Sequence, residues 1–233
     1  MKRTVFTKEQ KLLHHLILHS YDVPAALGLF DGMTGIMLVL AHYARVRKQP
    51  LVENASDFLM SRIVNNMTKS AVLDFANGMA GIGWGIEYLI QNGYMKGCGA
   101  ELTGELDEQI MNLDVRRMTD NSLEKGLCGL FHYVAVHVQG AMLQGKTVFD
   151  AQYIDDWLQV LMRKQAEYPQ ETQWKRMFVV LNDVLKGKVS YKPDLLPFVM
   201  PVKHVPIKQL GLRHGLAGYV EMQLQTERGE ERL

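Results

Sequence analysis

The sequence predicts an all-α protein in which helical hairpins form an α/α toroid, as an incomplete barrel. Three observations lead to this fold class. A polar–Gly–x–x–Gly motif recurs four times, an apolar run with helical spacing follows each motif, and no stretch resembles a series of strands. We expect about five hairpins with the GxxG motifs at the starts of inner helices, in a single domain over residues 1–233.

The four motifs set the period of the repeat. They read "FDGMTGIMLVL", "ANGMAGIGWGI", "EKGLCGLFHYV" and "RHGLAGYVEMQ", and their first glycines are Gly32, Gly78, Gly126 and Gly215. Successive first glycines are 46, 48 and 89 residues apart, so the last interval is close to two repeats. We therefore expect a repeat that lacks the glycines in this interval, at "TQWKRMFVVLNDVLKG".

The residues after the first motif predict an inner helix. Apolar side chains recur at helical spacing at Met33, Ile36, Met37, Leu40, Ala41 and Ala44. Leu38 and Val39 make the rest of this helix apolar as well. A helix that is apolar nearly all round belongs in the interior of a protein.

Between the motifs, single apolar stripes predict outer helices. One stripe consists of Val52, Ala55, Leu59 and Ile63, and a second consists of Ile154, Trp157, Leu158, Leu161 and Met162. The opposite faces carry charges that we expect in solvent, at Arg62, Asp155, Asp156 and Arg163.

The residues before the glycines predict how the inner helices begin. Asp31 and Asn77 occupy positions where an N-cap belongs, and glycine lets the chain turn sharply into a helix. Several inner helices would then begin at one end of the toroid, each with free amides and a partial positive charge. Such a mouth suits a small anionic ligand or an extended peptide, and we place Asp31, Asn77, Lys125 and Arg213 around it.

Prolines interrupt the pattern between residues 191 and 206. The stretch "YKPDLLPFVMPVKHVP" has prolines at 193, 197, 201 and 206, which exclude a regular helix and favour an extended arm. This arm is either a buried connector in place of an outer helix or a segment that binds a partner, namely a second copy of the chain or another helical protein.

Composition and charge argue against several function classes. Twenty-six basic and 25 acidic residues give a net charge of +1, so no field attracts nucleic acid or an anionic membrane. The apolar runs are too short to span a membrane, and the basic N-terminus lacks the apolar core of a signal peptide. Cys98 and Cys128 have no disulfide or zinc spacing. We expect a cytoplasmic protein with two free thiols.

In its glycine motifs the chain resembles the lanthionine synthetase C-like (LanC-like) family, from about Tyr21 to Leu224, and looks like a short bacterial branch of that family. The resemblance implies an α/α toroid whose catalytic members bind zinc and add cysteine thiols to dehydrated residues of a peptide precursor. Asp74 matches an aspartate four positions before a first glycine, and His214 matches the histidine of a His-Gly-x-x-Gly repeat.

The zinc ligands of that family have no counterpart in this chain. Arg213 stands before His214 where the family has a cysteine, Cys128 lies inside its glycine pair, and Cys98 lies in a predicted loop. Catalytic zinc needs three protein ligands that converge on one ion. We therefore expect no metal and no cofactor.

Asp74 and His214 are the candidate catalytic pair, as acid and base at the mouth of the toroid. Each also has a structural interpretation: His214 caps its helix, and Asp74 holds its loop by accepting backbone amides. His132 and His137 are predicted to be core or rim histidines, and Trp84 to pack in the core or line the cavity.

The expected function is that of a LanC-like protein that binds or presents a peptide during ribosomal peptide modification, without zinc-dependent cyclase activity. The first alternative is a zinc-independent peptide-modifying enzyme that uses Asp74 and His214. The second is an oligomeric interaction module in which the proline-rich arm contacts the partner.

Overall fold

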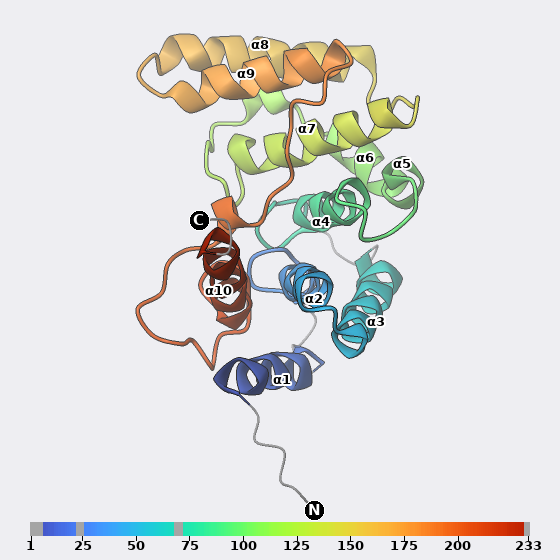
Figure 1. Ribbon diagram of the computed structural model, residues 1–233. Helices are drawn as coiled ribbons and strands as arrows, with labels where there is room; N and C mark the ends of the chain where they lie inside the picture. The colour runs from blue at the N-terminus through green and yellow to red at the C-terminus, as the bar shows by residue number, and fades with distance from the viewer. Residues whose placement is uncertain (1–6, 22–25, 68–71, 231–233) are drawn as a thin grey trace, which may run out of the picture. The chain divides into compact units, whose positions relative to one another are not determined.

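The computed structural model describes residues 7–21, 26–67 and 72–230, and the predicted domain ends at residues 1 and 233 lie outside this part (Figure 1). The described residues form helices and irregular segments, without a strand. The helices are α1 (Lys8–Ser20), α2 (Met33–Arg47), α3 (Pro50–Met67), α4 (Met79–Gln91), α5 (Gly99–Leu102), α6 (Gly104–Met111), η1 (Val115–Arg117), α7 (Leu127–Leu143), α8 (Ala151–Glu167), α9 (Thr172–Leu185), η2 (Leu196–Phe198) and α10 (Leu216–Glu230). The predicted all-α class is confirmed.

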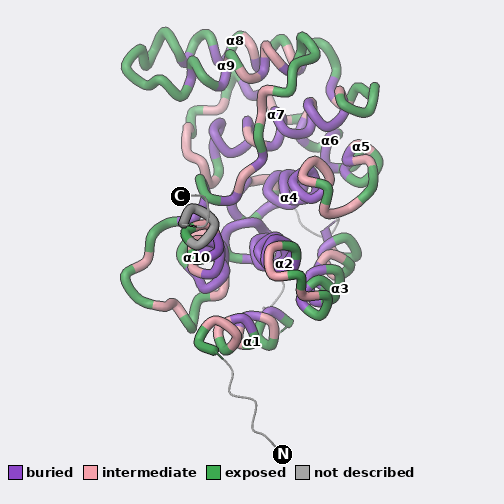
Figure 2. Tube along the Cα trace, viewed as in Figure 1, coloured by how far each residue is buried: buried purple, intermediate pink, exposed green. Residues whose placement is uncertain are grey.

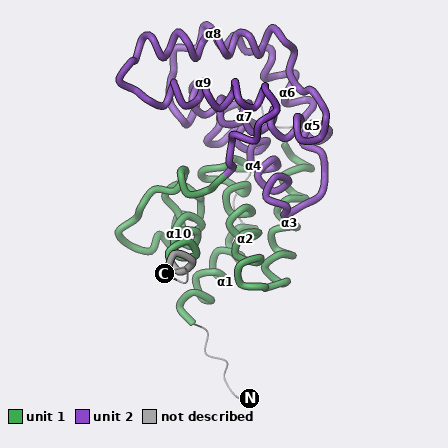
Figure 3. The backbone as a smooth tube through the Cα atoms, turned by 45° about the horizontal axis from the view of Figure 1, so that its top comes forward, with its two compact units in different colours: residues 1–70, 194–233 green, residues 71–193 purple. Residues whose placement is uncertain are grey.

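Backbone proximity divides the chain into two compact units (Figure 3). The first consists of residues 1–70 and 194–233 and the second of residues 71–193. The first unit contains the helices α1, α2, α3 and α10, and the second contains α4 to α9. Each unit thus has two helices that follow a glycine pair, and the prediction of a single domain stays a prediction.

Three of the helices that follow a glycine pair are buried over most of their length (Figure 2). In α2 every residue from Met33 to Ala44 is buried, and in α4 every residue from Met79 to Leu89. Helix α7 is buried in the same way over most of its residues. The expectation that the helix after the first motif is buried is therefore confirmed.

The predicted outer helices bury one face each. In α3 the stripe of Val52, Ala55, Leu59 and Ile63 is buried as predicted. In α8 the stripe is rotated, and its buried residues are Tyr153, Asp156, Trp157, Val160, Leu161 and Lys164. The prediction was wrong for Met162, which is 51% exposed, and for Asp156, which is buried.

The rotation of α8 has a local cause in the second unit. The short helix η1 packs against α8, and Arg116 Nη1 lies 3.5 Å from Asp156 Oδ1. Gln152 also donates a hydrogen bond to that carboxylate, at 3.0 Å. Because its charge has these partners, Asp156 stays on the covered face of the helix.

The loops before the glycine-headed helices share one backbone arrangement. In all four, the amide of the first helical residue donates to the carbonyl seven positions earlier, in the pairs Met33–Ala26, Met79–Val72, Leu127–Asp120 and Leu216–Gln209. A Cβ on any of the four first glycines would clash with backbone atoms of this loop. The glycines are required by this close approach, since Gly32, Gly78 and Gly126 have ordinary negative φ.

This arrangement corrects the predicted caps. The N-cap residues of α2 and α4 are Gly32 and Gly78, and neither helix has a side-chain cap. Asp31 and Asn77 therefore do not cap these helices. The expectation that the helix starts have free amides was also wrong for the first residue of each of these helices. The amide of that residue already donates to a carbonyl of the preceding loop.

The proline-rich stretch is irregular, as its prolines predict, apart from the single turn of η2. In the first unit it packs against its own chain, where Leu195 and Phe198 are buried and Met200 N donates to Arg213 O at 2.8 Å. These contacts agree with a connector. Binding of a partner by this arm stays a prediction.

Candidate functional site: an apolar pocket next to a buried histidine

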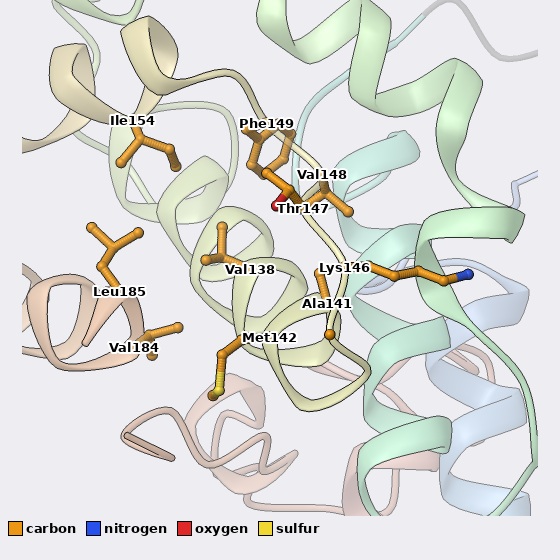
Figure 4. A pocket seen from close by; sticks show the side chains of 11 residues that line it. Val138, Ala141, Met142, Lys146, Thr147, Val148, Phe149, Ile154, Val184 and Leu185 are labelled. Atoms are coloured by element: carbon orange, nitrogen blue, oxygen red, sulfur yellow. The ribbon is translucent and has the colours of Figure 1, made fainter. Parts of the chain in front are cut away.

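Helices α7, α8 and α9 of the second unit, with the loop between α7 and α8, line a partly open pocket of about 370 Å³ (Figure 4). The residues that line it are Val138, Ala141, Met142, Gly145, Lys146, Thr147, Val148, Phe149, Ile154, Val184 and Leu185. Most of these side chains are apolar, and the volume is in the range of ordinary ligand sites. The pocket is therefore a candidate binding site for an apolar group.

The loop between α7 and α8 is held at both ends, which positions one wall of the pocket. Gly145 has a left-handed φ of 66°, and the amide of Lys146 reaches back to the carbonyl of Ala141, at 2.9 Å. At the other end, the side chain of Asp150 caps α8 by accepting from the amide of Tyr153, at 2.7 Å. Thr147, Val148 and Phe149 lie between these two fixed points.

Lys146 is the charged residue of the lining, and its side chain extends away from the apolar side chains (Figure 4). Its ammonium group donates to Glu101 Oε1 at 2.5 Å and to Cys98 Sγ at 3.1 Å. These hydrogen bonds, to Glu101 first and then to Cys98, raise the pKa of Lys146. The pocket therefore has apolar walls, and the ammonium group of Lys146 is directed away from them toward Glu101 and Cys98.

Phe149 links the pocket to a buried polar cluster. Its ring contacts that of His137 edge-on, with centroids 5.8 Å apart, and Tyr133 stacks on the same imidazole at 5.1 Å. The His137 ring lies between two carboxylates: Nδ1 is 2.7 Å from Glu87 Oε1, and Nε2 is 2.9 Å from Asp107 Oδ2. The hydroxyl of Tyr133 donates to the other oxygen of Asp107, at 2.6 Å.

The two carboxylates hold a charge on this buried imidazole. Burial alone disfavours the charged form, but the bonds to Asp107 and Glu87 outweigh it and raise the pKa of His137 to about 9. His137 therefore donates from both ring nitrogens at neutral pH. Its side chain is 0% exposed, so this cluster shapes the wall behind Phe149 and does not itself meet a ligand.

Two glutamines connect the cluster to the start of the proline-rich arm. Gln91 donates to Glu87 Oε2 at 2.8 Å, and Gln139 donates to the side-chain oxygen of Gln91 at 2.9 Å. The oxygen of Gln139 in turn accepts from the amides of Ser190 and Tyr191, at 2.9 and 2.8 Å. The arm thus begins at a defined place in the second unit.

The hydroxyl of Tyr191 makes a further attachment. It lies 2.8 Å from Trp84 Nε1 and 2.8 Å from His132 Nδ1. His132 as a residue is only partly covered, but its ring lies against Phe75, Phe131 and Tyr191, and burial lowers its pKa to about 4. The neutral imidazole therefore accepts a hydrogen bond from the tyrosine hydroxyl, while the indole donates one to the tyrosine oxygen.

The first unit contains a comparable pair. His42 of α2 lies with Nδ1 2.8 Å from Glu221 Oε2 of α10, and both side chains are at most 5% exposed. Gln225 donates to the other carboxylate oxygen at 3.0 Å. Each unit thus buries a histidine–glutamate pair between its two glycine-headed helices.

Three of the predicted site residues lie in the second unit, in the loops before α4 and α7. Asp74 Oδ1 accepts from the amide of Asn77 at 2.7 Å, which is the loop-holding contact. The amides of Phe75 and Ala76 donate to the carbonyl of Glu124, so the structure brings the loops of Asn77 and Lys125 together. Asn77 and Lys125 are exposed there.

The other three predicted residues lie in the first unit. The amide of Arg213 donates to the carbonyl of Phe30 at 3.2 Å, and its guanidinium lies 4.7 Å from the centre of the Phe30 ring. This places Arg213 next to the exposed Asp31, whereas His214 is exposed immediately before Gly215. Asp74 and His214 belong to different units, and their pairing as acid and base stays a prediction.

The donor set does not fit a zinc site of the LanC-like kind. Burial raises the pKa of the Cys128 thiol to about 11, which disfavours the thiolate that a metal needs. Cys98 is hydrogen-bonded to Lys146 in the second unit, and His214 lies in the first. The described residues contain no group of three His, Cys, Asp or Glu side chains arranged to hold a metal ion.

The sequence carries a signal for the buried pairs outside the glycine motifs. His42 interrupts "MLVLAHYA", Glu87 interrupts "GIGWGIEYLI" and His137 interrupts "YVAVHVQG". A single ionisable residue within an otherwise apolar helix predicts a buried partner. The identity of that partner and the pocket itself depend on helices that are distant in sequence.

Comparisons with family models, with curated proteins and with solved structures find no match to this chain. Among the described helices, none combines the length and the apolar character needed to cross a membrane.

Proposed function

We propose that this chain is a cytoplasmic LanC-like protein with an α/α toroid of helical hairpins, which binds a peptide during ribosomal peptide modification without zinc-dependent ring closure. The pocket of α7, α8 and α9 is the binding site, and it takes an apolar side chain of the peptide. The observation that carries this proposal is the apolar lining of a pocket of about 370 Å³.

The shape and chemistry of the pocket support an apolar side chain as its occupant. Val138, Ile154 and Val184 offer branched apolar groups from three different helices, and Met142 is a flexible side chain that adapts to its neighbour. Transfer of one apolar side chain of the peptide from water into an apolar site is favourable by about 1.5–3 kcal/mol. The affinity of one pocket is therefore modest, and the specificity is for apolar over polar residues.

Methyl NMR on the whole chain tests this site directly. We suggest titration with three capped tripeptides, Ac-Gly-Leu-Gly-NH2, Ac-Gly-Phe-Gly-NH2 and Ac-Gly-Ser-Gly-NH2, while the methyl signals of Val138, Ile154 and Leu185 are followed. The leucine and phenylalanine peptides are expected to shift these signals in a saturable way, and the serine peptide is not. Equal responses to all three, or none, would refute the pocket as the site.

A pair of substitutions on α9 separates the pocket from a general surface effect. Leu185 lines the pocket and is 42% exposed, whereas Val179 is 46% exposed on the same helix and does not line it. Leu185→Glu is expected to abolish the shifts at Val138 and Ile154, because a carboxylate would enter an apolar wall. Val179→Glu is the matched control and should bind as the unchanged protein does.

Metal analysis tests the proposed absence of zinc chemistry. Protein purified without an affinity tag, and the same protein with His214→Ala, are expected to contain no stoichiometric zinc by mass spectrometry. About one zinc per chain that is lost in the His214 variant would revive a metalloenzyme and overturn this part of the proposal.

A further inference from the structure

A cysteine, a lysine and a glutamate meet at the edge of the pocket in the second unit. Lys146 Nζ lies 3.1 Å from Cys98 Sγ and 2.5 Å from Glu101 Oε1. Cys98 is half-buried, and the side chain of Lys146 is 40% exposed. Both side chains therefore lie in a partly solvent-exposed part of the second unit.

The backbone on each side keeps these two groups together. Lys146 follows the left-handed Gly145, and its amide is bound to Ala141 O at the end of α7. Cys98 precedes α5, and its carbonyl accepts from the amide of Glu101 at 3.2 Å. A further bond from Gln144 Nε2 to Gly97 O, at 3.2 Å, joins the two loops directly. The lysine–cysteine contact thus follows from the loop geometry.

The position of Lys146 favours a reaction between its nitrogen and an oxidised Cys98. The ammonium group of Lys146 donates to the sulfur, at 3.1 Å. The thiolate is the form that reacts with peroxides, and the first product is a sulfenic acid. A sulfenic acid condenses with a nearby nitrogen, and here the amine of Lys146 is already in contact.

We propose that hydrogen peroxide converts Cys98 and Lys146 into a covalent sulfenamide, a reversible cross-link at the rim of the pocket. The Cys98 sulfur attacks one peroxide oxygen, the O–O bond breaks, and Lys146 supplies a proton to the departing hydroxide, which leaves as water. The amine lone pair then attacks the sulfur, an S–N bond forms and the S–O bond breaks. That second hydroxide takes a proton from the nitrogen and leaves as water.

Atoms, charge and electrons balance in this reaction. One thiol, one ammonium group and one hydrogen peroxide give one sulfenamide, two waters and one proton. Sulfur is oxidised by two electrons and the peroxide oxygens are reduced by two. A dithiol reductant restores the thiol and the amine by attack on the S–N bond.

The cross-link would join two loops of the second unit, residues 92–98 and 144–150. Lys146 belongs to the loop whose Thr147, Val148 and Phe149 line the pocket, so the bond would restrain that wall. The formation of the bond does not depend on whether the pocket binds a peptide, and its test is independent of the peptide titration.

Peptide mapping after oxidation tests the proposal. The whole protein is treated with about one equivalent of hydrogen peroxide, quenched, digested and analysed by mass spectrometry with and without dithiothreitol. We expect one peptide pair joined through Cys98 and Lys146, about two hydrogen masses lighter than the separate peptides, and its disappearance on reduction. Cys128 is the internal control, because burial raises the pKa of its thiol to about 11 and it should remain reduced.

Two substitutions decide the role of the lysine. Lys146→Arg keeps a cation beside the sulfur but replaces the amine by a weakly nucleophilic guanidinium, so Cys98 should stop at the sulfenic acid and react with dimedone. Cys98→Ser should give neither product. If unchanged protein yields sulfinic acid, a disulfide between chains or an unmodified Cys98, with no peptide linked to Lys146, the proposal is overturned.

Discussion

The Nδ1 atom of His137 lies 2.7 Å from Oε1 of Glu87, in a space that exists because residues 99 and 140 are glycines. A Cβ at either glycine would clash with the Glu87 carboxylate. The two side chains of the pair are 0% and 1% exposed. Loss of one partner of a buried ion pair costs far more than its formation gains, so the packing of α4 against α7 depends on this arrangement.

Loss of the positive charge on His137 is expected to make the protein less stable at alkaline pH. Its pKa is raised from 6.5 to about 9, so its contribution is fully present below about pH 6.5 and is lost as the pH rises through about 9. The rise corresponds to about 3 kcal/mol of unfolding free energy. Urea unfolding at several pH values between about 6 and 10 measures this loss.

The variant Glu87→Gln is the control for that profile. This substitution removes one of the two carboxylates that contact the His137 ring. The pKa of His137 should therefore fall, and the stability that depends on its charge should be lost at lower pH. Subtraction of the two profiles cancels other groups that titrate in the same range. A difference profile that is flat from about pH 6 to 10 would contradict the assignment of charge to His137.

Gly140→Ala is expected to destabilise the protein even though alanine favours a helix. The new Cβ would clash with the Glu87 carboxylate and displace it from His137, at a cost of about 1–3 kcal/mol. Helix propensity alone would change stability by about 1 kcal/mol in the opposite direction. Gly104→Ala is the matched control, because a Cβ at residue 104 would have no neighbouring atom within 4 Å. Thermal or urea unfolding that ranks the two variants equally would refute the steric argument.

Gly126→Ala is expected to disturb the loop before α7. Its Cβ would clash with the carbonyl of Asp120 and the amide of Ser122, which are backbone atoms and do not move aside as a side chain does. We expect a loss of about 1–3 kcal/mol in unfolding free energy. The neighbouring exposed Lys125→Ala should change stability by less than about 0.5 kcal/mol. Wild-type stability of the Gly126 variant would show that this loop is not tightly packed.

Tyr191→Phe is expected to loosen the start of the proline-rich arm. The substitution removes the hydroxyl that lies between Trp84 Nε1 and His132 Nδ1, and a lost buried hydrogen-bond partner costs about 1–3 kcal/mol. Unfolding monitored by tryptophan fluorescence reports both the stability and the environment of Trp84. Tyr168→Phe, at an exposed tyrosine of the same unit, should leave both unchanged. Identical behaviour of the two variants would exclude an anchoring role for Tyr191.

Helical periodicity and glycine spacing predicted the helices well because both are local properties. The all-round apolar run of α2 and the single stripe of α3 are buried as their patterns predict. The buried face of α8 is rotated about the helix axis relative to the predicted stripe. Arg116 of η1 and Gln152 provide partners for Asp156 on the covered face. The pattern of one helix carries no information about which charges a neighbouring segment will pair.

The sequence alone determined that this protein is helical, that four glycine pairs precede helices, and that prolines exclude a regular helix between residues 191 and 206. These features arise from interactions within about ten residues of the chain. Only the tertiary structure decided that loop backbone, and not Asp31 or Asn77, surrounds the helix starts, and that His137 meets both Glu87 and Asp107. The pocket of α7, α8 and α9 was also decided only by the tertiary structure. Its shape depends on how side chains from helices distant in sequence pack together.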